Sequence, residues 1–149
     1  MSLVQDPGAN EILRPWLAAR LPLPADLSKA SCIGVARDRR LVAAVAFTSH
    51  NGGNCEISMA ADSPRWATPA TIYSILAYPF FQLGCRRVTC LTQRGNKRTR
   101  RFLEGIGFKL EGCIREWWAD GEKVHDALVY GLLRSEFIIG KFAKGMRHA

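Results

Sequence analysis

The sequence has no hydrophobic run long enough to cross a membrane. Its longest apolar stretches, residues 41–47 and a similar segment near Leu132, are far shorter than the roughly 20 residues that a spanning helix needs. A secretory signal would place an unbroken apolar segment in the first thirty residues, but here charged residues and prolines interrupt it: Asp6, Pro7, Glu11 and Pro15. We therefore expect a soluble, cytoplasmic protein with no membrane partner.

Cysteine and histidine are too few and too scattered for a metal centre or a disulfide framework. The chain has five cysteines, none in a C-x-x-C pair, and three histidines that lie far from them in the sequence. Zinc sites and disulfide scaffolds both require closer and more regular spacing. The sequence therefore predicts buried free thiols and no metal.

Repeats, low-complexity tracts and Ser/Gly/Pro-rich linkers are also absent from the 149 residues. With 48% apolar residues, a chain of this length buries roughly 70% of the surface that its unfolded form exposes. We therefore expect a single domain covering residues 1–149.

Acidic residues are fewer than basic ones. The chain has 21 Lys and Arg against 13 Asp and Glu, giving a net charge of +8 and a pI of about 9.7. This balance favours an anionic partner. Charge alone leaves three classes open, namely a nucleic acid, a phosphorylated cofactor and an acidic protein surface.

Periodicity of the apolar residues indicates six strands. Residues 32–37 and 41–49 form a predicted hairpin, and a third strand follows at 55–61. Another strand is expected at 87–92, and the Asp120-Gly121 turn predicts a hairpin of residues 108–118 and 122–132. Both faces of the 41–49 strand are apolar, which is typical of a strand covered on both sides.

Helical spacing occurs at residues 10–20, 68–83 and 96–106. Thr68 is a good N-cap for the 68–83 helix, with Pro69 at its first helical position, and Pro79 should kink that helix. Asn96 is a good N-cap for the 96–106 helix, and Gly107 supplies its left-handed end. The order of elements predicts an α/β (α+β) fold, in which a mixed, mostly antiparallel central sheet has helices on both faces.

One segment resembles a known family. Residues 96–108 (NKRTRRFLEGIGF) are similar to the Asn-x-x-(Ala/Ser)-x-x-x-Leu-Glu-x-x-Gly-Phe motif of the GCN5-related N-acetyltransferases (GNAT). Residues 111–112 (EG), the Asp120-Gly121 turn, residues 125–133 (HDALVYGLL) and residues 134–137 resemble the ribosomal-protein amino-terminal acetylating branch of that family. The ordered match spans residues 33–137 and agrees with the predicted order of elements.

The resemblance implies a GNAT-like acyl-CoA N-acyltransferase fold that binds acetyl-CoA where strands 55–61 and 87–92 splay apart. The pantetheine arm would complete the hydrogen bonding of the open strands, and the diphosphate would lie at the start of the Thr68 helix. The residues that this implies for cofactor binding are Met59, Ala61, Arg65, Thr68, Ala70, Asn96 and Arg101.

Transfer of the acetyl group to a primary amine needs a base, and an acid for the leaving thiolate. Glu56, on the strand beside the cleft, is the candidate base. Thr99 is at a position where some relatives carry a Ser near the thioester sulfur. Many relatives use a Tyr as the general acid seven residues after the motif Asn, but this chain has Leu103 there. Of Trp117 and Trp118, one should point to the core and the other outward, and the outward ring could shape the acceptor site. The acceptor is either a small molecule or a protein amino terminus.

The expected phosphate loop departs from the family pattern. The family has (Arg/Gln)-x-x-Gly-x-(Gly/Ala) before this helix, but residues 63–70 (SPRWATPA) contain no glycine, and Trp66 stands at the first glycine position. A catalytically silent structural or interaction module of the same fold is therefore an alternative. A second alternative is a nucleic-acid-binding protein that uses the basic cluster at residues 94–101. The same cluster could instead hold the CoA phosphates.

Overall fold

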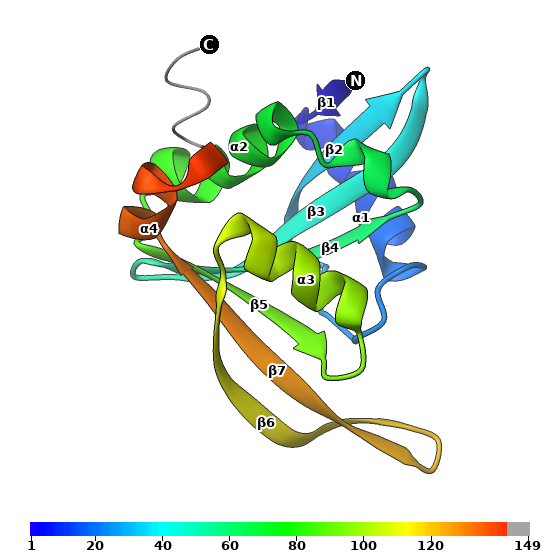
Figure 1. Ribbon diagram of the computed structural model, residues 1–149. Coiled ribbons are helices and arrows are strands. Elements are labelled where there is room, and N and C mark those ends of the chain that lie inside the picture. Colours follow the sequence, from blue (N-terminus) through cyan, green and yellow to red (C-terminus); the bar gives the residue numbers. More distant parts are fainter. Residues whose placement is uncertain (143–149) are drawn as a thin grey trace.

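The computed structural model describes residues 1–142 as a seven-stranded sheet with helices on both faces (Figure 1). The strands are β1 (Ser2–Val4), β2 (Ser31–Arg37), β3 (Arg40–Asn51), β4 (Asn54–Ala61), β5 (Arg87–Gln93), β6 (Lys109–Asp120) and β7 (Lys123–Leu133). Their order across the sheet is β1-β2-β3-β4-β5-β7-β6. Only β4 and β5 run parallel, so the predicted mixed, mostly antiparallel sheet is confirmed.

The helices divide between the two faces of the sheet. Helix α1 (Asn10–Ala18) packs on one face through Leu13 and Leu17, against the β3 residues Ala44 and Ala46. The main core lies on the other face, beneath α2 (Pro69–Ala77), α3 (Lys97–Ile106) and α4 (Arg134–Ile139). Residues 43–46 of β3 are fully buried, as expected for a strand that is covered on both sides.

Local signals in the sequence fix the ends of these elements. Thr68 and Asn96 cap α2 and α3, because their side-chain oxygens accept the N–H groups of Thr71 and Thr99 at 3.2 Å. Gly107 ends α3 with φ +122°. A kink was predicted at Pro79. The structure has a change of helix type there: α2 ends at Ala77 and is followed by the π-helical turn η3 (Tyr78–Gln82), which needs no N–H from the proline.

Two elements were not predicted. Strand β1 is three residues long, too short to show a period, and it joins the edge of β2. Helix α4 begins without a Ser, Thr, Asp or Asn cap; instead, the Glu136 carboxylate accepts the Leu133 N–H at 2.9 Å. Two short 3-10 turns, η1 (Pro7–Ala9) and η2 (Pro64–Trp66), precede α1 and α2.

The cysteines are all free, but not all of them are buried. Cys32, Cys55, Cys85 and Cys90 lie in the interior, whereas Cys113 is exposed on the edge strand β6, so the prediction was wrong for this one thiol. Within residues 1–142 no cluster of His, Cys, Asp and Glu could hold a metal ion. In the same part of the chain, no helix is both long enough and apolar enough to cross a membrane.

Candidate active site

Strands β4 and β5 separate partway along their length. Their parallel pairing runs from Asn54↔Arg87 to Ile57↔Cys90 and stops there. Beyond that point β4 stays paired with β3 as far as Ala61, and β5 stays paired with β7 as far as Gln93. The backbone groups that face the opening therefore have no strand partner, as the resemblance predicted.

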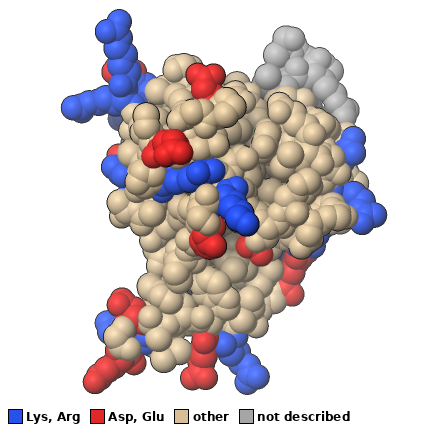
Figure 2. Space-filling model, turned by 180° about the vertical axis from the view of Figure 1, so that it is seen from behind, with Lys and Arg blue, Asp and Glu red and all other residues tan. Residues whose placement is uncertain are grey.

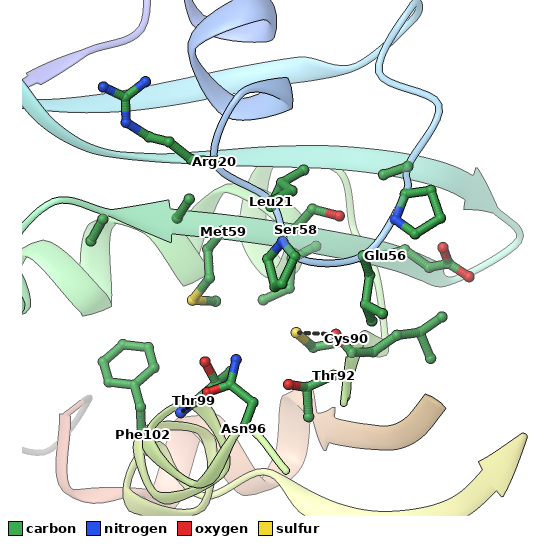
Figure 3. A pocket seen from close by; sticks show the side chains of 18 of the residues that line it. Arg20, Leu21, Glu56, Ser58, Met59, Cys90, Thr92, Asn96, Thr99 and Phe102 are labelled. Carbon is green, nitrogen blue, oxygen red and sulfur yellow. Dashed lines mark hydrogen bonds between the residues drawn. The ribbon is translucent and has the colours of Figure 1, made fainter. Parts of the chain in front are cut away.

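The opening leads into a cavity of about 660 Å³. Because side chains alternate along a strand, β4 contributes residues to both faces of the sheet. Met59 points toward Thr99 and Phe102 of α3, whereas Glu56 and Ser58 belong to the face that carries the segment after α1 (Figure 3). The cavity thus reaches both faces of the sheet through the gap between the two strands.

The structure brings some of the predicted site residues together and leaves others outside. The cavity wall includes five of them: Glu56, Met59, Ala61, Asn96 and Thr99. The remaining four do not line it. Arg65, Ala70 and Arg101 are exposed elsewhere on the surface. The Thr68 hydroxyl is used as the helix cap, where it accepts the Thr71 N–H and donates to the Thr71 hydroxyl at 2.8 Å. Roles in cofactor binding and catalysis stay predictions for all nine.

Asn96 and Thr99 retain free polar groups at the cavity. The Asn96 Oδ1 caps α3, which leaves its amide nitrogen without a hydrogen-bond partner among the described residues. Thr99 uses its backbone N–H in that cap, and its hydroxyl has no partner in the same part of the chain. Both groups can therefore donate to a molecule in the cavity.

Cys90 lies at the vertex where the strands separate. It is buried, and its thiol contacts the Leu91 carbonyl with a sulfur–oxygen distance of 3.8 Å. Burial and, to a lesser extent, the negative charge of Glu56 raise the pKa of Cys90 to about 12. The vertex therefore holds a neutral thiol rather than a thiolate.

The loop before α2 uses most of its own N–H groups. The Arg65 N–H donates to Ser63 Oγ, and the Ala67 and Thr68 N–H groups donate to carbonyls of η2. Pro64 and Pro69 have no N–H. A diphosphate at this helix start would therefore meet fewer free donors than a glycine-rich loop offers.

Trp66 is part of the core and also lines the cavity. It is 6% exposed, and its ring lies 5.6 Å from that of Phe102 on α3. The indole bridges the loop before α2 and helix α3, yet the cavity beside it stays open. The opening between β4 and β5 thus keeps its free backbone groups, and Arg98 is a cation on the cavity wall.

The helical spacing of residues 96–106 predicts an outer face for α3 made of Lys97, Arg98, Arg100, Arg101 and Glu104. These residues are exposed or half-buried, but three of them make contacts that this prediction did not include. Arg98, four residues before Phe102, lines the cavity with it. Arg100 donates through Nε to the Tyr130 hydroxyl at 3.1 Å, and that hydroxyl donates to Glu104 at 3.2 Å. Helical i, i+4 spacing from Phe102 would have placed Arg98 at the cavity.

Sequence reasoning missed the segment after α1 as part of the wall, but it named Trp117 and Trp118 as candidates for shaping the acceptor site. The segment after α1 covers the side of Glu56 and contributes residues 21–26, of which Leu21 is labelled in Figure 3. Trp117 reaches the cavity from β6, whereas Trp118 stacks on His125 with ring centroids 5.0 Å apart. Neither tryptophan enters the core, which corrects the simple division that alternation predicted.

Comparison with known proteins supports the fold and goes no further. No protein-family model matches the sequence, and no curated protein matches it. A spermidine N-acetyltransferase SpeG chimera from Vibrio cholerae and hSSAT has a similar structure, with a TM-score of 0.76, 14% sequence identity, and coverage of 93% of this chain and 99% of that one.

Two other solved structures are similar. One is a probable acetyltransferase, with a TM-score of 0.66, 22% identity, and coverage of 85% of this chain and 70% of that one. The other is a GNAT-family acetyltransferase from Bacillus anthracis, with a TM-score of 0.60, 22% identity, and coverage of 70% and 67%. Together with the split between β4 and β5, these similarities show that the chain has the fold of the GNAT acetyltransferases.

Proposed function

We propose that this chain is an N-acetyltransferase that moves the acetyl group of acetyl-CoA directly to a primary amine. The observation that carries the proposal is the separation of β4 and β5 after Ile57 and Cys90, which opens a cavity to both faces of the sheet. A donor bound on the α3 side and an amine bound on the Glu56 side would meet in this gap. The spermidine N-acetyltransferases of the same fold support an amine as the acceptor.

Acetyl-CoA, when bound, supplies an acetyl group activated as a thioester. The free backbone groups of β4 beyond Ile57 would hold its pantetheine arm, and Asn96 and Thr99 would donate hydrogen bonds to it from α3. The Arg98 guanidinium, which has no ion-pair partner among the described residues, would hold its phosphates.

Glu56 would serve as the base. A primary amine is protonated at neutral pH and is a nucleophile only after it loses that proton, which the Glu56 carboxylate would accept directly or through a water. Thr99 would offer its hydroxyl to the developing thiolate. The partly buried apolar side chains of Met59 and Phe102 would keep water away from the thioester.

A silent module of the same fold is the second candidate. It is favoured by the loop before α2, whose N–H groups are largely engaged, and by Trp66 at the place of a glycine. Such a protein would keep the sheet and the helices but would not bind the cofactor.

Binding to nucleic acid is a third candidate. The net charge of +8 favours it, but Arg98 and Arg100 of the basic cluster at residues 94–101 are directed to the cavity and to Tyr130. On the face opposite α3, basic and acidic side chains are interspersed over a largely uncharged surface (Figure 2). Retention on a polyanion column that Lys97→Glu/Arg101→Glu abolishes would support this candidate.

Thermal unfolding with and without millimolar acetyl-CoA separates the enzyme from the silent module. Acetyl-CoA at about 100 times its Kd adds about 2.7 kcal/mol to the free energy of unfolding, which raises Tm by roughly 5–10 °C for a domain of this size. Mass spectrometry of a mixture with acetyl-CoA and primary amines, including a peptide, then detects transfer. No rise in Tm and no acetylated product would favour the silent module. The similarity of the C-terminal segment to the ribosomal-protein acetylating branch stays a prediction that the peptide tests.

A further inference from the structure

A β-bulge in β6 lies next to Trp117, which lines the cavity. After a first register shift between Leu110 and Gly112, the pairing of β6 with β7 continues to Ile114↔Ala127, breaks, and resumes at Trp118↔His125. Three residues of β6, 115–117, therefore face the single residue Asp126 of β7. Such a bulge changes the direction in which the strand's side chains point.

Asp126 fixes the bulge. Its carboxylate accepts the Glu116 N–H at 2.8 Å, and Glu116 adopts a φ of +51°, which is unusual for a residue with a side chain. Without this hydrogen bond the left-handed turn would have no acceptor for its N–H among the described residues. The bulge therefore depends on Asp126.

The bulge lies where the β6–β7 hairpin leaves the sheet. Strand β7 pairs with β5 up to Gln93↔Ala127, and beyond that pair its described residues pair with β6 alone. Figure 1 shows the two strands continuing as an arm past the end of β5. Trp117 thus reaches the cavity from a two-stranded arm that extends beyond the pairing with β5.

The wall near Trp117 and Glu56 is mainly apolar. The apolar residues are Leu21, Pro22, Leu23 and Pro24 of the segment after α1, Leu91 of β5 and Trp117 of the arm. Among the described residues that line the cavity, Glu56 and Asp26 are the acidic ones. One oxygen of the Asp26 carboxylate accepts hydrogen bonds from the hydroxyl and the N–H of Ser28 at 2.7 and 3.0 Å. Arg20, on the same side, is paired with Asp62.

We propose that the acceptor is a primary monoamine with an aromatic or aliphatic arm, and that Trp117, positioned by Asp126, selects for that arm. This inference rests on the proposed function. A single ammonium group would meet Glu56, while the arm would lie against Trp117 and the prolines. A polyamine would bring further ammonium groups to a wall whose second carboxylate, Asp26, already uses one oxygen to bind Ser28, and ammonium groups left without a partner are costly to remove from water.

The experiment compares acceptors and variants. Full-length protein is mixed with acetyl-CoA and with phenethylamine, spermidine or a short peptide that begins with leucine, and the products are quantified by mass spectrometry. We expect kcat/KM to be at least about tenfold higher for phenethylamine or the leucine peptide than for spermidine, a difference of about 1.4 kcal/mol. These two arms distinguish a small amine from a protein amino terminus, which share the same chemistry.

The variants test the role of Trp117 and of the bulge. Trp117→Ala should raise KM for phenethylamine about tenfold, with kcat and the values for spermidine little changed. Asp126→Ala should reproduce that rise in KM, and Asp126→Asn should restore the wild-type value because its amide oxygen still accepts the Glu116 N–H. Trp118→Ala, which alters the neighbouring ring outside the cavity, is the matched control and should change nothing.

Calorimetric titration of each amine into the protein without acetyl-CoA separates the two proposals. If no amine is acetylated but phenethylamine binds at least tenfold more tightly than spermidine, the proposed function fails and the selectivity stands. If spermidine binds or reacts as well as phenethylamine, or if Trp117→Ala alters neither, the inference is overturned.

Discussion

Ile57 and Cys90 form the last pair between β4 and β5, and both residues are almost fully buried. Every feature of the candidate site depends on this pair, because the cavity opens immediately beyond it. On one side β4 continues with Met59 toward α3, and on the other the sheet continues through β5 to β7.

Cys90 should resist alkylation although it lines the cavity. Its pKa is raised to about 12 by burial and by the charge of Glu56, so at pH 8 it is a neutral thiol, and only the thiolate reacts. Treatment of the folded protein with iodoacetamide should label the exposed Cys113 first and leave Cys90 unmodified until urea unfolds the chain. Peptide mapping checks this, and early labelling of Cys90 would contradict it.

Replacement of Glu56 should affect the chemical step and leave cofactor binding intact. Glu56→Gln keeps the shape of the side chain but cannot accept the proton, and loss of a general base lowers kcat by about 10²–10⁴-fold. The rise in Tm with acetyl-CoA should equal that of the wild type. Glu122→Gln, in the exposed turn of the hairpin, is the control for a lost carboxylate. An unchanged kcat in Glu56→Gln would remove Glu56 from the mechanism.

Pro69→Ala should strengthen cofactor binding. Pro69 is the first residue of α2 and cannot donate, whereas alanine restores one N–H at the helix start, where a phosphate would lie. A hydrogen bond to a charged group contributes about 1.5–3 kcal/mol, so the Kd for acetyl-CoA should fall by about tenfold or more. Pro7→Ala, at the start of η1, makes the same change away from the cavity. Equal affinity in both variants and the wild type would show that the phosphates bind elsewhere.

The Tyr130 hydroxyl should matter for stability. It is fully buried, accepts from Arg100 and donates to Glu104, and so links β7 to α3. Tyr130→Phe leaves both partners without this bond and should lower the free energy of unfolding by about 1–3 kcal/mol, measured by urea denaturation. Tyr73→Phe is the control, because its hydroxyl has no partner among the described residues. A loss no greater than that of the control would show that the link contributes nothing.

Helix α4 should loosen in acid. The Lys109 ammonium, 2.5 Å away, and the Leu133 N–H lower the pKa of Glu136 below its usual 4.5. Because the folded pKa is the lower one, the stabilisation is complete at neutral pH, above 4.5, and is lost as the pH falls through the folded value. Lys109, whose pKa is raised chiefly by the same bond, contributes fully below its usual 10.5 and loses that contribution at higher pH.

Urea denaturation between pH 6 and pH 3 checks the acid limb of this prediction. The free energy of unfolding should fall more steeply in the wild type than in Glu136→Gln, which keeps an acceptor for the Leu133 N–H but has no charge to lose. Identical slopes would show that the ion pair does not contribute to the folded state.

Prediction from the sequence succeeded where local chemistry decides the outcome. Caps such as Thr68 and Asn96 and the left-handed Gly107 act within a few residues of their own position, so the sequence alone locates the helices they bound. The six predicted strands were recovered for the same reason, because alternation of side chains is a local property. Short elements such as β1 offer too few residues for any period to show.

Much of the candidate site could not be predicted in this way. Arg98 was placed on the outer face of α3 and lies at the cavity, and Trp117 reaches the cavity through a bulge that depends on Asp126 of another strand. The loop before α2 shows the same limit: its lack of glycine was visible, but the use of its N–H groups by Ser63 and η2 was not. Contacts between distant segments decided each of these points.

The sequence by itself determined the order of the main strands and helices, the caps that bound α2 and α3, and the burial of β3 on both faces, because each follows from residue type and spacing over a few positions. Only the tertiary structure decided where β4 and β5 separate, which side chains line the opening and how Trp117 enters it. Those features arise where segments that are distant in the chain come together, such as residues 54–57 with 87–90 in the sheet and residues 21–26 with Trp117 at the cavity wall, and no local pattern encodes such arrangements.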